Sequence, residues 1–370
     1  TREDLRRAYP YDMFALPLHD IVRLHSTSGT TGKPVVVGYS KNDLKHWTEC
    51  TARVLAAADI TEHDVVQICF EYSLFTGGLG FHQGAERIGA SVIPASGGNV
   101  ERQVLIARDY KTTAILATPS YAMSIASALG ELGINPNSLF LRAGLFGAEP
   151  WSENLRAEIE RSLFLRALDN YGLTEVMGPG VAYECDRRDG LHINEDHFIA
   201  EVVDPHSGEP LGEGAEGELV LTTITKEGFP LIRYRTGDVT RLIGGPCGCG
   251  RSFSRIARIG GRTDDLLFVS GVKLFPSQIE QILLEAEEAA PHYRIVLDRE
   301  RGVDVMEVEV EISESIGAID ELKNLERLRD TIRSRIEAEV GIRPRVTLVE
   351  PKTIARITRG KARRVEDRRT

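Results

Sequence analysis

The feature that most constrains the fold of this chain is an alternation, between residues 20 and 146, of short apolar runs with longer segments of helical period. The short runs lie at residues 35–37, 64–69, 90–94 and 113–117, and the helical segments include residues 42–58 and 120–132. Such alternation is typical of β-α-β units, in which a helix connects two parallel strands. We therefore predict an α/β fold with a mainly parallel sheet in this half of the chain.

The pattern changes twice further along the chain. Residues 198–242 show strands separated by turns, which predict an antiparallel sheet or a small distorted barrel. The last hundred residues indicate a smaller α+β domain. Its expected elements are a helix that begins at Pro276, strands at 293–297, 304–312 and 345–349, and a long helix at 319–340. We place the boundary between residues 263 and 264, which predicts an N-terminal domain 1–263 and a C-terminal domain 264–370.

Composition excludes several classes of function. The 45 basic and 55 acidic residues leave a net charge of -10, which argues against nucleic acid or an anionic membrane as a partner. No apolar run reaches the roughly 18 residues of a membrane span, and the charged N-terminus does not resemble a secretory signal. We expect a cytoplasmic protein. The first residues already indicate a helix followed by a proline-containing connector, so we also expect that a leader segment is missing.

The stretch Ser26-Thr27-Ser28-Gly29-Thr30-Thr31-Gly32-Lys33-Pro34 is the most informative chemical signal. Hydroxyls, glycines and a lysine in one short loop can surround phosphate oxygens with N–H, O–H and ammonium groups. A Walker A loop is excluded, because only two residues separate Gly29 from Gly32 and Pro34 stands where that motif has its magnesium-binding hydroxyl. A solvated Ser/Thr/Gly linker is the alternative.

Four further stretches follow in a fixed order. They are Tyr171-Gly172-Leu173-Thr174-Glu175, Tyr234-Arg235-Thr236-Gly237-Asp238, Gly261-Arg262-Thr263-Asp264-Asp265 and Gly360-Lys361. With the Ser/Thr/Gly loop, their order and separation resemble the adenylate-forming acyl-CoA synthetases over nearly the whole chain. Within that superfamily, four more stretches are similar to the phenylacetate–CoA ligase branch: residues 75–80, 84–87, 146–151 and 275–280.

The resemblance implies an ATP-dependent, AMP-forming acid–thiol ligase. A carboxylate and MgATP would give acyl-AMP and pyrophosphate, and the thiol of CoA would then displace AMP. The implied phosphate-binding residues are Ser26, Thr27, Ser28, Gly29, Thr30, Thr31, Gly32 and Lys33, and the implied AMP-pocket residues are Gly147, Ala148, Glu149, Tyr171, Gly172, Asp238 and Arg262. In these roles Thr174 meets the α-phosphate, Glu175 binds Mg²⁺, Tyr171 stacks on adenine and Asp238 accepts the ribose hydroxyls.

The resemblance also implies a mobile C-terminal domain. Lys361 would bridge the acyl carboxylate and the α-phosphate during adenylation, although a solvated lysine in a basic tail is the alternative. Asp264 would be the hinge, with an exposed acidic turn as its alternative, and Gly271 would line the path of CoA after rotation.

The acyl pocket is implied less directly. Tyr72, Phe75 and Phe146 could surround an aromatic ring, and Gly77 and Gly78 would leave room for a flat substrate. Aromatic residues at this spacing also occur as simple core. The predicted small-molecule partners are therefore an aromatic acid, ATP and CoA, and a homodimer is a candidate assembly.

Four residues form a candidate zinc site: Cys185, His192, Cys247 and Cys249. Three thiolates and one imidazole would complete a closed tetrahedral site, which is the structural type. Four unrelated residues on two loops are the alternative. Two other functions stay open at this point, an adenylating enzyme that loads a carrier protein or another nucleophile, and a catalytically silent scaffold. The set Lys33, Glu175, Asp238 and Lys361 argues against the scaffold.

Overall fold

The computed structural model describes residues 1–27, 33–263, 267–286, 289–300, 303–312, 321–354 and 364–369. The described residues divide into two compact units. The larger unit comprises Thr1–Glu149 and Ile159–Gly260, and the smaller comprises Pro150–Glu158 and the described residues from Gly261 onward. Each unit has its own sheet and its own apolar core.

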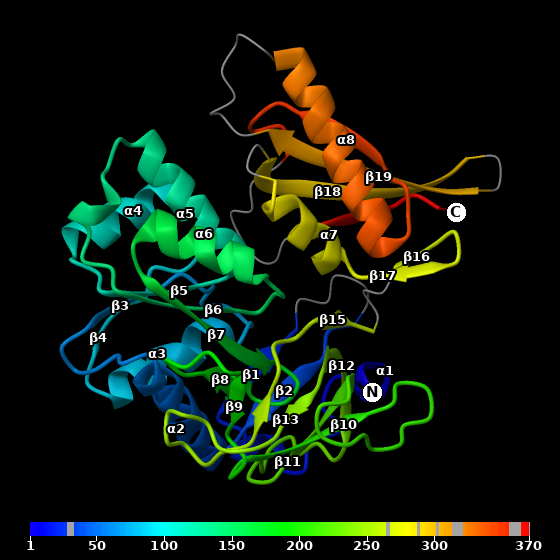
Figure 1. Ribbon diagram of the computed structural model, residues 1–370. Helices are drawn as coiled ribbons and strands as arrows, with labels where there is room; N and C mark the ends of the chain where they lie inside the picture. Colours follow the sequence, from blue (N-terminus) through cyan, green and yellow to red (C-terminus); the bar gives the residue numbers. More distant parts are fainter. Residues whose placement is uncertain are drawn as a thin grey trace. The chain divides into compact units, whose positions relative to one another are not determined.

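A nine-stranded mixed sheet forms the centre of the larger unit (Figure 1). Its order is β13-β14-β9-β8-β7-β6-β5-β3-β4. The strands are β3 (Val65–Ile68), β4 (Ser91–Ile93), β5 (Ala114–Ala117), β6 (Ala143–Gly147), β7 (Arg166–Leu173), β8 (Gly178–Glu184), β9 (Leu191–Ile193), β13 (Leu242–Ile243) and β14 (Arg255–Ile256). The strands from β4 to β7 pair in parallel, whereas β7, β8, β9, β14 and β13 pair antiparallel.

Helices cover both faces of the parallel half of this sheet. In Figure 1, α2 and α3 lie on one face, and α4 and α5 lie on the other. Their bounds are α2 (Lys41–Ala57), α3 (Gly77–Arg87), α4 (Val100–Asp109) and α5 (Pro119–Glu131). The starts of α2 and α5 are set by local sequence. Ser40 and Asp43 form a capping box at α2, and Pro119 occupies the first turn of α5. Apolar side chains of α2 and α3, such as Leu55 and Phe81, pack on β3 and β5 as one buried core.

Two smaller sheets complete the larger unit. A hairpin pairs β1 (Arg23–Ser26) with β2 (Val36–Tyr39), and an antiparallel sheet joins β10 (Phe198–Val203), β11 (Gly217–Thr223) and β12 (Tyr234–Thr240). The remaining short elements are α1 (Arg2–Arg7), η1 (Leu18–Asp20), η2 (Pro136–Ser138) and, crossing into the smaller unit, α6 (Glu153–Leu163).

The smaller unit has a four-stranded sheet with the order β20-β19-β18-β21. Helices α7 and α8 lie beside this sheet (Figure 1). They contribute Ile279, Ile332 and Ile336 to the apolar core of the smaller unit. The elements are β15 (Gly261–Arg262), β16 (Leu267–Val269), β17 (Val272–Leu274), α7 (Pro276–Leu284), β18 (Ala289–Glu300), β19 (Val303–Ile312), α8 (Glu321–Val340), β20 (Arg345–Val349) and β21 (Val365–Asp367).

The predicted α/β class is confirmed, with one correction in detail. Residues 35–37 do not enter the parallel sheet. Val36 and Val37 belong to the antiparallel β1–β2 hairpin, in which Val36 pairs with Ser26 across the Ser/Thr/Gly loop, and Val35 immediately precedes β2. Among the described residues, no helix combines the length and the apolar character that a membrane span requires.

Candidate active site and metal centre

The predicted nucleotide residues of the larger unit gather where β6 and β7 end. These neighbours run in parallel, with Gly147 opposite Asn170, so their carboxyl ends meet at one edge of the sheet. Gly147 ends β6 and is followed by Ala148 and Glu149, while Tyr171 and Gly172 lie in the last residues of β7. The Glu149 carboxylate accepts a 2.7 Å hydrogen bond from the backbone N–H of Ser120 in α5. Two segments separated in sequence are thus brought to one place.

Tyr171 and Asp238 are in direct contact. The Tyr171 hydroxyl donates a 2.5 Å hydrogen bond to the Asp238 carboxylate, and both side chains are buried. Asp238 comes from β12, so this bond joins the β10–β12 sheet to the central sheet. The bond was not predicted from the sequence, because 67 residues separate its partners. It fixes both the tilt of the Tyr171 ring and the direction of the carboxylate.

Thr174 and Glu175 follow β7 and are both buried. The Thr174 hydroxyl lies 3.2 Å from the hydroxyl of Thr76, the N-cap residue of α3. The Glu175 carboxylate lies 3.4 Å from Nε of Arg2 in α1. Neither Thr76 nor Arg2 was predicted as a site residue from the sequence. Thr76 lies inside the stretch 75–80 that carries the resemblance, whereas Arg2 had no local signal.

The Ser/Thr/Gly loop is described at its two ends. The backbone N–H of Thr27 bonds to the Val35 carbonyl at 3.0 Å, and the Thr27 hydroxyl accepts from Val35 N–H at 3.0 Å. Ser26 is buried, and Lys33 Nζ lies 5.5 Å from the ring centroid of Tyr9. Five predicted loop residues lie outside the described residues: Ser28, Gly29, Thr30, Thr31 and Gly32. The predicted hinge Asp264 and lysine Lys361 lie outside them as well.

The predicted acyl-pocket residues have structural partners. The Tyr72 hydroxyl lies 3.1 Å from Nδ1 of His82, and burial raises the pKa of Tyr72. Phe75 is half-buried against Phe70, and Phe146 is fully buried.

The glycines at the start of α3 have a packing reason of their own. A Cβ on Gly77 would lie 2.6 Å from the ring of Phe75, and one on Gly78 would lie 2.7 Å from the carbonyl oxygen of Glu71. Close packing therefore accounts for both glycines without a substrate. In the smaller unit, Arg262 is half-buried on β15, and Gly271 lies in the exposed turn between β16 and β17 with φ +85.

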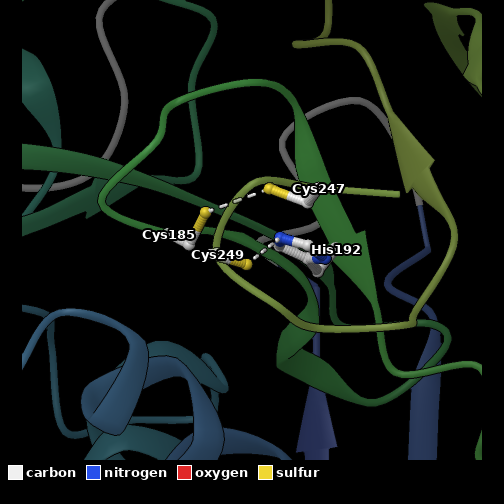
Figure 2. Close-up of side chains that lie close together, drawn as sticks. All are labelled: Cys185, His192, Cys247 and Cys249. Carbon is white, nitrogen blue, oxygen red and sulfur yellow. Dashed lines mark hydrogen bonds between the residues drawn. The ribbon is translucent and has the colours of Figure 1, made fainter. Parts of the chain in front are cut away.

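The four predicted zinc ligands lie together (Figure 2). Cys185 follows β8, His192 is on β9, and Cys247 and Cys249 lie in the loop between β13 and β14. Their ligand atoms all lie within 4.8 Å of one another. The Cys185 and Cys247 sulfurs are 3.7 Å apart, and Cys249 Sγ is 3.4 Å from His192 Nε2.

These distances suit a tetrahedral metal and exclude a disulfide. A disulfide needs about 2.05 Å between sulfurs, whereas four ligands at about 2.3 Å from zinc have sulfurs about 3.8 Å apart. His192 Nδ1 lies 3.4 Å from the Phe253 carbonyl, a contact that leaves Nε2 toward the thiols. Burial raises the pKa of the Cys249 thiol, but hydrogen bonds from the backbone and side chain of Arg251 and from Cys247 and Cys185 together outweigh burial and lower the pKa to about 7. The donor set therefore fits Zn²⁺.

Residues 6–225 match the family model of AMP-binding enzymes, and residues 271–369 match that of the AMP-binding enzyme C-terminal domain. The phenylacetate–coenzyme A ligase of Escherichia coli is 47% identical over 371 residues, which cover 100% of this chain and 84% of that protein. This chain belongs to the phenylacetate–coenzyme A ligase family of AMP-binding enzymes. The predicted family is thereby confirmed.

Further relatives agree with this membership. The phenylacetate–coenzyme A ligase of Thermus thermophilus is 46% identical over 380 residues, covering 100% of this chain and 85% of that protein. A solved structure of 2-hydroxyisobutyryl-CoA ligase in the postadenylation state matches with a TM-score of 0.92 and 30% identity, covering 99% of this chain and 78% of that one. Its thioesterification state with CoA matches with a TM-score of 0.69, 30% identity and the same coverage.

Proposed function

We propose that this protein is an AMP-forming ligase that activates phenylacetate, or a closely similar aryl acid, and transfers it to CoA. The observation that carries the proposal is an identity of 45–47% to four phenylacetate–coenzyme A ligases, each covering 100% of this chain. The family membership and the gathering of Tyr171, Thr174, Glu175 and Asp238 support an ATP-dependent reaction.

In the first half-reaction, an oxygen of the acid would attack the α-phosphorus of ATP and the bond to pyrophosphate would break. Charge builds on the phosphate oxygens during this step, and donors that are already in place stabilise it. We assign the phosphates to the loop from Ser26 to Lys33 and the α-phosphate to Thr174. The Thr76 hydroxyl, 3.2 Å from that of Thr174, would orient it.

Glu175 fits a Mg²⁺ ligand, because its buried carboxylate already faces a cation at 3.4 Å, the Arg2 guanidinium. Mg²⁺ would neutralise phosphate charge there. For the nucleoside we assign the adenine to the Tyr171 face and the ribose hydroxyls to Asp238. The 2.5 Å bond between these two side chains would hold the ring and the carboxylate at a set angle to each other.

In the second half-reaction, the CoA sulfur would attack the acyl carbon, the thiol proton would leave and AMP would depart. We propose that residues 264–370 form a mobile domain that carries Lys361 for adenylation, pivots at Asp264 and then presents Gly271 to the thiol. Solved structures of 2-hydroxyisobutyryl-CoA ligase in both a postadenylation and a thioesterification state support two arrangements of such a domain.

We further propose that Cys185, His192, Cys247 and Cys249 hold a structural Zn²⁺ that joins the β8–β9 turn to the β13–β14 loop. The distances among the four ligand atoms support this assignment. A homodimer and a cytoplasmic location stay predictions.

The test is a two-part assay on the purified chain. Pyrophosphate release is measured with MgATP and a panel of aryl acids, with and without CoA, and the product is identified by mass spectrometry. We expect phenylacetate to give pyrophosphate and, with CoA, phenylacetyl-CoA, and the matched variant Glu175→Gln to give much less of both. Pyrophosphate release without any thioester would instead favour transfer to a carrier protein. If no acid in the panel leads to pyrophosphate release, the proposal is refuted.

A further inference from the structure

A buried lysine in the larger unit lies close to the nucleotide-binding segment. Lys226 follows β11 and is only 5% exposed. Its Nζ has no hydrogen-bond partner among the described residues and lies 3.3 Å from the ring centroid of Tyr39. A buried amine without a partner is costly to a folded protein. The presence of a lysine at this buried position, with its amine on an aromatic face, therefore requires an explanation.

Tyr39 connects this amine to the turn that carries Thr174 and Glu175. The Tyr39 hydroxyl donates a 2.9 Å hydrogen bond to the carbonyl of Met177. Trp47 stacks on Tyr39, with centroids 4.9 Å apart and planes 18° apart, and its Nε1 donates to the Pro179 carbonyl at 2.9 Å. The two aromatic side chains therefore hold the backbone immediately after Glu175.

The held backbone has an unusual conformation. Gly178, between the two acceptor carbonyls, has φ +101, and a Cβ there would lie 2.6 Å from the Trp47 ring. A side chain at this position would be strained, so the turn depends on its neighbours for its shape. A displacement of Tyr39 would shift the Met177 carbonyl and, two residues earlier, Glu175.

The backbone around Lys226 is itself fixed. Asp43 is fully buried, and its carboxylate accepts hydrogen bonds from the N–H groups of Glu227 at 2.7 Å and Gly228 at 2.9 Å. With Trp47 stacked against Tyr39 and the amine of Lys226 over the same ring, Tyr39 is held on both faces. His25 packs edge-on against both rings at 5.6 Å. Burial lowers the pKa of Lys226 against the smaller, opposing effect of Asp43, and burial together with Lys226 lowers the pKa of His25. The pKa of the Tyr39 hydroxyl is raised chiefly by burial, and Asp43, Arg23 and Glu175 also act on it.

We propose that Lys226 is a positioning residue for the nucleotide site, which holds Tyr39 so that the Tyr39–Met177 hydrogen bond sets the places of Thr174 and Glu175. The inference rests on the proposed roles of Thr174 and Glu175. A role in core packing alone would not require an amine at this position. An apolar side chain of equal length would fill the same space without the free-energy cost of a buried amine.

The test replaces the amine and keeps the length, in the variant Lys226→Met. Binding is measured at pH 6, where the amine of Lys226 is protonated. A desolvated cation on an aromatic face contributes on the order of 2 kcal/mol, or roughly 30-fold in Kd, so we expect the Kd for MgATP to rise by roughly 10- to 30-fold while the melting temperature stays equal or increases. Weaker binding together with unchanged or higher stability would not follow from lost packing. MgATP affinity within twofold of wild type, or parallel loss of stability and affinity, would overturn the proposal.

Two further variants make the test specific. Tyr39→Phe removes only the hydroxyl that reaches Met177 and should weaken MgATP binding similarly. The double variant Lys226→Met/Tyr39→Phe should be no worse than Tyr39→Phe, and additive losses would contradict action through Tyr39. Lys111→Met is the matched control, because Lys111 also lies over an aromatic ring, Phe140, at 5.7 Å. It should change nothing.

Equilibrium binding of MgATP separates this inference from the proposed function. If the wild-type chain binds MgATP but activates no aryl acid, the proposed function fails while the comparison of variants still decides the role of Lys226. If the chain turns over phenylacetate and Lys226→Met binds MgATP like wild type, only the positioning role fails.

Discussion

The variant Lys226→Met should also change how the stability of the protein depends on pH. Burial lowers the pKa of Lys226 from 10.5 to about 7, against the opposing influence of Asp43. Between these pH values the unfolded chain holds a proton that the folded chain lacks, so wild-type stability rises with pH over this window. The cost of burying the amine is complete below pH 7 and disappears above about pH 10.5.

The magnitude follows from the same shift. At 1.36 kcal/mol per pKa unit, burial of the charged amine costs about 5 kcal/mol, and the Tyr39 face offsets up to about 2 kcal/mol. We therefore expect Lys226→Met to be more stable than wild type by roughly 3–5 kcal/mol at pH 6 and by about 1 kcal/mol or less at pH 10.

The assay is guanidinium unfolding followed by tryptophan fluorescence at pH 6, 8 and 10. The chain has two tryptophans, and Trp47 stacks on Tyr39 beside the substituted position. Lys111→Met supplies the correction for general alkaline effects. A stability difference that does not change between pH 6 and pH 10, or a variant that is less stable than wild type at pH 6, would refute the reasoning.

Four other expectations concern the site. Arg2→Ala should lower the Mg²⁺ concentration for half-maximal adenylation, because Arg2 competes for the Glu175 carboxylate. We expect a two- to fivefold decrease, roughly the free energy of one partly exposed ion pair. A higher Mg²⁺ requirement would contradict this expectation. Cys249→Ala should reduce bound zinc from about one per chain and lower the melting temperature with little change in ATP affinity, and a metal-free wild-type protein by elemental analysis would exclude the site. Gly271→Leu should slow thiolation of acyl-AMP more than its formation, whereas Gly341→Leu, at a similar φ of +79, should slow neither half-reaction selectively. Lys361→Ala should slow adenylation about 10²–10³-fold in single-turnover assays and leave thiolation of preformed acyl-AMP largely intact; acyl-AMP formation at the wild-type rate would rule out the role.

The elements that were predicted well carry their signals locally. Ser40 and Asp43 form the capping box at the start of α2, and Pro276 lies in the first turn of α7, so both helix starts are marked within a single turn of sequence. The strand Arg345–Val349 was predicted at its observed bounds. The family could likewise be recognised from the sequence, because its motifs are short contiguous stretches that follow one another in a fixed order along the chain. The four candidate zinc-binding residues were named from chemistry and spacing, and the structure places them together.

Residues that act through distant partners were not predictable in this way. Val36 has the same apolar character as the strands of the parallel sheet, and only its pairing with Ser26 shows that it belongs to a separate hairpin. The sequence indicates that Gly78 leaves room, but only the structure shows that the carbonyl of Glu71 lies where a Cβ on Gly78 would be; its role in the acyl pocket stays a prediction.

The sequence by itself therefore determined the fold class, the family and the identity of most candidate site residues, since each depends on residue type and local order. The tertiary structure alone decided which groups meet: Tyr171 with Asp238, Arg2 with Glu175, and Lys226 with Tyr39. The physical reason is that such contacts depend on the register and packing of elements far apart in sequence, such as β2 with the segment after β11. From the sequence, a lysine in a polar loop is expected to be solvated. Only the structure shows that Lys226 is buried against an aromatic face, where its amine carries a free-energy cost that a functional role would explain.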